Sequence, residues 1–305
     1  MKNILWVCCF MILLPLVSRA QMKNTVSEVR EYKEVDGKII ITCLVNSVEA
    51  DFVLDLAGQT AILPEYVEKF NIDTTEKAKI PYDCFQYKNI PTFRSVSLNS
   101  ISFGNNAFAN GLGAFVLKDE PYLRELGVAG IVGGAIFQRV VLTIDSQRKK
   151  LTMSQPYRPS YMKLTNRANA QLLQGVGMEC PITIDGVTFS CMLDTWNKGL
   201  VELNATDFAR LTGTAGKNVQ VYAGYGKTLV MVPAKVVGQC DFVRMAFKDV
   251  SIAENKSLIR SVIGTEILKH GLLSVDFLRQ TIYFQPFDEV TVKDDVIENH
   301  VTVES

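Results

Sequence analysis

Asp51-Phe-Val-Leu-Asp-Leu-Ala-Gly-Gln-Thr-Ala-Ile-Leu63 is the stretch that decides the fold, because the chain repeats its pattern. The second copy is Ser190-Cys-Met-Leu-Asp-Thr-Trp-Asn-Lys-Gly-Leu-Val-Glu202, and the two central acids, Asp55 and Asp194, are 139 residues apart. In each copy an apolar run ends at the Asp, the chain turns, and apolar residues resume. A carboxylate at the end of a buried strand is costly unless something pairs with it, so each acid is a candidate partner for the other.

A second repeated motif follows the two Asp stretches, one copy in each half of the chain. Ile131-Val-Gly133 precedes an Asp in the first half, and Val262-Ile-Gly264 precedes one in the second. Both intervals, from Gly133 to Asp145 and from Gly264 to Asp276, are 12 residues long. A repeat of this length indicates a duplicated domain and not a solenoid.

Strand patterns dominate both halves, so the sequence predicts a mostly β protein with short helices in two similar lobes. Hairpin turns are expected at Asn46-Ser47 and Asp185-Gly186, and short helices are expected after Pro64 and after the capping residue Asn204. We expect a signal peptide over 1–20, an N-terminal lobe over 21–156, a linker over 157–170, a C-terminal lobe over 171–287 and a polar tail over 288–305.

The first twenty residues have the pattern of a secretory signal. Lys2 precedes an apolar run from Ile4 to Val17, and Ser18-Arg-Ala20 is a small-residue cleavage site. The apolar run is shorter than the roughly 20 residues that a spanning helix needs, so we expect no membrane span in the mature chain. The expected location is outside the cytoplasm, either periplasmic or secreted.

Charge and residue usage exclude several classes of function. The 32 basic and 32 acidic residues balance, whereas a nucleic-acid surface needs concentrated Lys and Arg. With two histidines, His270 and His300, and no Cys-x-x-Cys pair, a metal site is poorly supported. We therefore expect no metal, no cofactor and no nucleic-acid partner.

Five cysteines remain after the expected cleavage, an odd number, so at least one is not paired within the chain. Counting outward from the turn at Asp185-Gly186 places Cys180 directly opposite Cys191, within disulfide range. The same count puts them at a hydrogen-bonded pair, the wider and less favourable kind. Cys180 and Cys191 are the disulfide candidate, and the pairing of Cys43, Cys84 and Cys240 stays open.

These motifs resemble the aspartic-peptidase superfamily, with its pepsin-like and retropepsin-like enzymes. Val53-Leu-Asp55 and Met192-Leu-Asp194 are similar to the family's apolar-apolar-Asp element, and the two apolar-apolar-Gly stretches are similar to the strands that bracket it. The resemblance covers about residues 38 to 286. It implies two lobes of closed β-barrel type with a cleft between them.

The resemblance also implies a chemistry. The two carboxylates would share one proton, and together they would activate a water to attack a peptide bond. The catalytic candidates are then Asp55 and Asp194, with the flap-like hairpin Tyr222-Ala-Gly-Tyr-Gly226 over the cleft. Another aromatic segment, from Tyr82 to Tyr87, is either a further flap or an ordinary surface loop. The candidate substrate-binding residues are Ala57, Gly58, Thr195, Trp196, Tyr222 and Tyr225.

The departures from the family pattern leave two functions open. Where the family has Thr-Gly after each Asp, this chain has Leu56-Ala57 and Thr195-Trp196. Leu56 has no hydroxyl for a reciprocal lock between the turns, and Trp196 puts a large side chain where the family keeps none. The first function is an exported aspartic endopeptidase, possibly attenuated, and the alternative is a catalytically silent peptide- or protein-binding member of the fold. A Trp196 side chain that fills the cleft would argue against hydrolysis.

Overall fold

The computed structural model describes residues 26–289, except 76–86, 88–93, 106, 119, 174–176 and 225–227. The expected signal peptide lies outside the described residues, and so does nearly all of the expected polar tail. Within the described part, none of the helices has the length and apolar character needed to cross a membrane.

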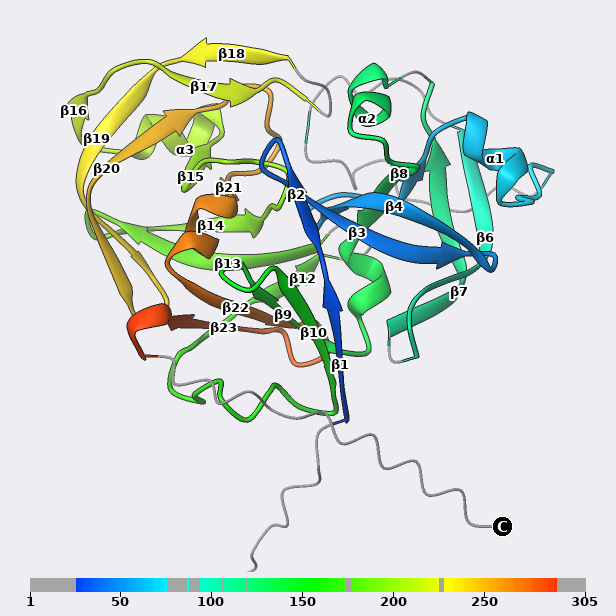
Figure 1. The fold of residues 1–305 in the computed structure, drawn as a ribbon. Helices are drawn as coiled ribbons and strands as arrows, with labels where there is room; N and C mark the ends of the chain where they lie inside the picture. The colour runs from blue at the N-terminus through cyan, green and yellow to red at the C-terminus, as the bar shows by residue number, and fades with distance from the viewer. Residues whose placement is uncertain are drawn as a thin grey trace, which may run out of the picture.

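The N-terminal lobe is a closed β-barrel (Figure 1). Its strands run in the order β3-β4-β8-β5-β7-β6, and β6 pairs back with β3 to close the ring. β2 adds to the outside of β3. The strands are β2 Lys33–Val35, β3 Lys38–Val45, β4 Val48–Asp55, β5 Ala61–Ile62, β6 Arg94–Phe103, β7 Ala107–Val116 and β8 Gly130–Gly133.

The C-terminal lobe repeats this order as β13-β14-β21-β15-β20-β19, closed by the pairing of β13 with β19. The strands of this half are β12 Gln171–Leu173, β13 Gly177–Ile184, β14 Val187–Leu193, β15 Val201–Leu203, β16 Thr214–Ala215, β17 Val219–Tyr222, β18 Leu229–Val232, β19 Ala234–Phe242, β20 Met245–Glu254 and β21 Val262–Ile263. The expected mostly β fold with two barrel-type lobes is therefore confirmed.

A third sheet joins the lobes, in the order β1-β10-β9-β22-β23-β11. Its central pair takes one strand from each half, and the Thr143 and Ser274 hydroxyls meet there at 2.5 Å. β11 lies inside the segment expected to be a linker, so that segment is partly ordered into the sheet. The strands are β1 Val26–Glu31, β9 Val141–Asp145, β10 Lys150–Gln155, β11 Arg167–Asn169, β22 Gly271–Asp276 and β23 Thr281–Pro286.

The helices of the described chain are short, as expected. α1 (Glu65–Lys69) follows Pro64, α2 is Pro121–Glu125 and α3 is Ala205–Arg210. Single-turn 3₁₀ helices are η2 Gly134–Phe137, η3 Thr265–Lys269 and η4 Phe287–Glu289. η2 and η3 occupy equivalent places in the two halves, since each begins directly after a Gly, Gly133 at the end of β8 and Gly264 just after β21.

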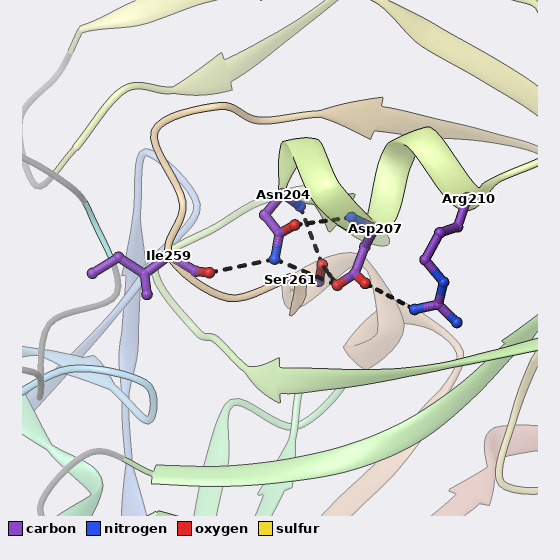
Figure 2. A network of polar contacts seen from close by, with 5 residues as sticks. All are labelled: Asn204, Asp207, Arg210, Ile259 and Ser261. Carbon is purple, nitrogen blue, oxygen red and sulfur yellow. Dashed lines mark hydrogen bonds and ion pairs between the residues drawn. The ribbon is translucent and has the colours of Figure 1, made fainter.

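The cap of α3 also fixes the strand that brackets the second Asp turn (Figure 2). The Asn204 side chain accepts a hydrogen bond from the amide of Asp207 at 3.0 Å, as the capping pattern predicts. Ser261 donates to the Asp207 carboxylate at 2.6 Å and accepts from the Asn204 amide at 3.1 Å. Because Ser261 precedes β21 directly, this network anchors β21 to the start of α3.

The cysteine hairpin has the expected register but not the expected bridge. Cys180 lies directly opposite Cys191, and the thiols of both are free and buried. Burial raises the pKa of the Cys191 thiol well above its usual value. The geometric reason against a bridge is the hydrogen-bonded site, where paired residues are farther apart than at the alternate sites of the ladder.

Candidate active site

Each Asp turn is held in place by the Gly strand that brackets it. In the first lobe Asp55 pairs with Gly133 in the parallel β4–β8 ladder. In the second, the Asp194 amide donates to the carbonyl of Ile263, the residue before Gly264, at 2.9 Å. A Cβ at Gly133 would lie 2.2 Å from the Gly58 carbonyl oxygen, and one at Gly264 would lie 2.3 Å from the Gly199 carbonyl oxygen. Only glycine allows this close approach. The apolar-apolar-Gly motif of each lobe therefore holds the Asp turn of the same lobe in place.

The turn amides point at the carboxylates. The Ala57 amide donates to Asp55 Oδ1 at 3.0 Å, and the Trp196 amide donates to Asp194 Oδ1 at 2.7 Å. Asp194 accepts further bonds from Asn197, at 3.2 Å from the backbone amide and at 2.7 Å from Nδ2. The side chain of Asn197 was not expected at the site, because the resemblance was carried only as far as Trp196.

Both carboxylates are buried, with Asp55 1% and Asp194 2% exposed. Burial raises the pKa of Asp194, and the donors from Trp196 and Asn197 act in the opposite direction. A buried carboxylate with several donors is stabilised as the anion more than burial alone would allow.

A single hydroxyl ties the two Asp turns together. Thr195 Oγ1 donates to the Leu54 carbonyl oxygen at 2.7 Å and accepts from the Leu56 amide at 3.1 Å. The repeated turns therefore touch across the lobe boundary. Both hydrogen bonds use a hydroxyl of the second lobe. Leu56, the equivalent residue of the first lobe, has no hydroxyl and cannot form the reciprocal bonds.

The Trp196 side chain lies in the space between the lobes and is fully buried. Its indole Nε1 donates to the Gly224 carbonyl oxygen at 3.2 Å. Its ring meets Tyr122 of the first lobe edge to face, with centroids 6.0 Å apart, and Tyr222 of the second at 6.2 Å. The Trp196 ring therefore packs against one tyrosine from each lobe.

Lys38 is the site residue that sequence reasoning missed. It starts β3 of the first lobe, is fully buried, and its Nζ donates a hydrogen bond to the Trp196 carbonyl oxygen. The same Nζ lies 4.2 Å from the centroid of the Trp196 ring and 3.7 Å from that of Tyr222. Burial lowers the pKa of Lys38 to about 7, against the opposing attraction of Asp194 and Asp55. A lysine directly after the Asp36-Gly37 turn was the only signal in the sequence.

Glu202 is another buried acid, and Asn255 connects it to Tyr222. Glu202 Oε2 accepts from Asn255 Nδ2 at 2.7 Å, and the same amide group donates to the Tyr222 carbonyl oxygen at 3.0 Å. Burial raises the pKa of Glu202 to about 7, and the charge of Asp194 adds to the effect. Lys38 and these acids form one electrostatically linked group.

Two segments of the first lobe, at Tyr87 and at the β2–β3 hairpin, contact the second lobe beside this group. The Tyr87 hydroxyl donates to Asn197 Oδ1 at 3.1 Å, and Tyr87 forms a β-bridge with Leu258. On the β2–β3 hairpin, Asp36 accepts from Lys198 Nζ at 2.8 Å and from the Tyr122 hydroxyl at 2.6 Å. The Lys198 ammonium and then the Tyr122 hydroxyl hold the pKa of Asp36 below its ordinary value. Figure 1 shows β2 between the two barrels.

The expected cleft is closed at the residues assigned to it. Tyr225 lies outside the described residues, and the other substrate-binding candidates, Ala57, Gly58, Thr195, Trp196 and Tyr222, are all buried. Tyr82 also lies outside the described residues, whereas the Tyr87 hydroxyl donates to Asn197 Oδ1. The physical reason for the closure is packing, since Trp196 and Lys38 occupy the space between the lobes. Within the described ranges no group of three or more His, Cys, Asp and Glu side chains could hold a metal ion.

Two closed barrels joined by one sheet, each with an Asp turn bracketed by a Gly strand, define a two-lobed aspartic-peptidase-like fold. No protein-family model matches the chain, and no curated protein matches it. Among solved structures the chain is similar to a retropepsin-like aspartic protease from Rickettsia conorii, at 21% sequence identity and a TM-score of 0.30. That match covers 44% of this chain and 96% of the other.

Proposed function

We propose that this protein is an exported, catalytically silent member of the aspartic-peptidase-like fold that binds a peptide or another protein. The observation that carries the proposal is the position of Trp196, which packs between Tyr122 and Tyr222 where hydrolysis requires access to Asp194. A substrate carbonyl and a water would have to occupy that space for the reaction to occur.

Lys38 supports the same conclusion on electrostatic grounds. Hydrolysis by two carboxylates needs one proton shared between them, because one acid must protonate the carbonyl while the other accepts a proton from water. A nearby ammonium favours the charged form of both acids. Lys38 interacts with both Asp55 and Asp194, so its charge acts against the singly protonated pair that the reaction needs, whereas the burial of Asp194 raises the pKa of that acid and acts the other way.

An attenuated aspartic endopeptidase is the second candidate, and one observation favours it. The donors to the carboxylates are intact, with the Ala57 amide on Asp55 and the Trp196 amide on Asp194. The Thr195 hydroxyl still joins the two turns. If Trp196 and Lys38 moved together, the two turns would keep the geometry that the carboxylate chemistry requires.

A cleavage assay combined with a binding assay separates the candidates. Purified protein lacking residues 1–20 is incubated with a quenched fluorescent peptide library at acidic and at neutral pH, with Asp194→Asn as the matched control. A silent binder gives equal, background signals for both proteins and retains peptides in a binding assay. An attenuated peptidase gives cleavage that the Asp194→Asn change removes.

Export is part of the proposal and rests on the leader pattern. Cleavage after Ala20 would leave a mature chain that begins at Gln21. N-terminal sequencing of protein recovered from outside the cytoplasm should find Gln21. Intact Met1 in the cytoplasmic fraction would contradict export.

A further inference from the structure

The turns at one end of the sheet that joins the lobes carry basic residues and no acid. β10 ends, β9 begins and β22 ends at this edge, because Val141 pairs with both Ser154 and Asp276. The turns beyond these points are 138–140, 155–160 and 277–280, and they contain neither Asp nor Glu but hold Arg139, Arg158 and Arg279. We call these three turns the basic end.

Leu278 and Tyr157 add exposed apolar surface to the basic end. Leu278 is 72% exposed, more than any other large hydrophobic side chain of the described residues, and Tyr157 is 51% exposed. Arg279 connects the two, since it follows Leu278 directly and its guanidinium carbon lies 4.6 Å from the centroid of the Tyr157 ring. An aliphatic tip, an aromatic ring and arginines side by side are the residue types that proteins place at the headgroup level of a membrane.

The two acids next to the basic end are each paired with an arginine. Asp276 pairs with Arg279 at 3.0 Å. Glu28 of β1 pairs with Arg30 of the same strand at 2.5 Å. These acids therefore leave the charge of Arg139 in place, and the basic end has a net positive charge.

The N-terminal part of the chain enters the fold at the basic end. Val26, the first residue of β1, pairs with Gln155 in the second of the three turns. Before Val26 the sequence has the apolar run from Ile4 to Val17 and then residues 21–25, which contain one lysine and no acid. An apolar leader of this kind directs a chain to a membrane. The basic end is thus the part of the fold that is joined directly to the membrane-directed segment.

We propose that the basic end binds the surface of an anionic membrane, with Leu278 and Tyr157 at the headgroup level and the arginines against lipid phosphates. The two kinds of contact act together, since neither a few charges nor one apolar group gives stable binding alone. β1 begins at the bottom of Figure 1, whereas β17, β18 and α2 lie at the top. A membrane at the basic end therefore leaves the β17–β18 hairpin facing away from it. The proposal goes beyond peptide binding and involves neither Asp turn.

Co-sedimentation with lipid vesicles tests the proposal on the mature chain, residues 21–305. We expect wild type to bind phosphatidylglycerol vesicles and not phosphatidylcholine vesicles. Leu278→Asn should lower the partition coefficient about tenfold and Arg139→Gln about fivefold. Leu164→Asn is the matched control, because Leu164 is 54% exposed but lies beside the opposite end of β23, where the neighbouring Lys163 amide donates to the Gln285 side chain. This control should bind as wild type does.

Three results would overturn the proposal. The first is no binding of wild type to phosphatidylglycerol vesicles, and the second is an equal loss of binding in Leu278→Asn and Leu164→Asn. The third is a loss in Arg139→Gln with none in Leu278→Asn. That result would assign the basic end to a soluble acidic partner, because charge alone would then account for the binding.

A tryptophan probe tests insertion separately from affinity. The mature chain has one tryptophan, Trp196, which is fully buried. Leu278→Trp adds a second at the tip of the basic end, and Leu164→Trp adds one at the control position. Phosphatidylglycerol vesicles should shift the emission of Leu278→Trp to shorter wavelength and leave that of Leu164→Trp unchanged. Equal shifts in the two variants, or no shift in either, would contradict insertion of the basic end into the headgroup layer.

Discussion

Lys38 of the first lobe donates a hydrogen bond to the carbonyl oxygen of Trp196 in the second, and its Nζ lies 4.2 Å from the centroid of the Trp196 ring. This contact joins the start of the first barrel to the turn that follows Asp194. It places a buried cation against a buried aromatic ring between the lobes.

Removing the Thr195 hydroxyl should weaken the contact between the Asp turns. Thr195→Val leaves the Leu54 carbonyl and the Leu56 amide buried without their shared partner, which should lower the free energy of unfolding by about 2 to 4 kcal/mol. Urea denaturation measures the loss. Thr188→Val is the matched control, because its hydroxyl pairs with Thr183 on an exposed face and should have little effect. Equal losses in both variants would show that the Thr195 hydrogen bonds between the lobes stabilise the fold no more than the exposed Thr188 hydroxyl does.

Glu202 should make stability fall as pH rises. Its pKa is raised from 4.5 to about 7, so the folded state binds more protons than the unfolded state between these values. Its contribution is then fully present below pH 4.5 and is lost as pH rises through about 7. Glu202→Gln keeps the acceptor for Asn255 and should gain about 3 kcal/mol relative to wild type across this window. Urea denaturation at several pH values measures the difference, and a constant difference would refute the shift.

The contribution of Lys38 to stability should change with pH in the opposite direction to that of Glu202. Its pKa is lowered from 10.5 to about 7, so the folded state binds fewer protons than the unfolded state between these values, and stability rises with pH there. Lys38→Met lacks this rise. The free energy of unfolding of wild type, relative to that of Lys38→Met, should therefore rise by about 5 kcal/mol between pH 7 and pH 10.5. Parallel stability curves would mean that the amine is not buried as described.

Replacing Trp196 by glycine should create a cavity beside Lys38. Loss of a large buried ring typically costs about 3 to 5 kcal/mol, and Lys38 loses one of its two aromatic faces. We expect Trp196→Gly to be destabilised and to bind peptide more weakly than wild type. Isothermal titration calorimetry with a peptide that wild type retains in the binding assay measures binding. Stronger peptide binding by Trp196→Gly would show that the ring blocks the ligand site and does not form it.

The repeat was enough to predict the fold because its signals are local. The turns at Asn46-Ser47 and Asp185-Gly186 set the hairpin registers, and Asn204 set the start of α3. Each of these depends on a few neighbouring residues. Gly133 was matched to the first Asp turn through the repeated apolar-apolar-Gly pattern, and the structure shows why it is glycine, since a Cβ there would lie 2.2 Å from the Gly58 carbonyl oxygen.

The filling of the site could not be predicted, because it depends on how the lobes pack. Trp196 was identified as the deciding residue, but the sequence does not say that Tyr122 and Tyr222 meet its ring. Lys38 begins a strand whose face is predictable, yet its partners belong to the other lobe. The side chain of Asn197, which donates to Asp194, was missed for the same reason.

Peptide hydrolysis by the mature wild-type chain tests the central claim most directly. The assay follows cleavage of a quenched peptide library from acidic to neutral pH, with Asp194→Asn and Asp55→Asn measured beside it. We predict background signal from all three proteins at every pH, because Trp196 and Lys38 fill the space that a scissile peptide would need. Cleavage by wild type that either Asp→Asn change abolishes would contradict the claim and identify the protein as a working aspartic peptidase.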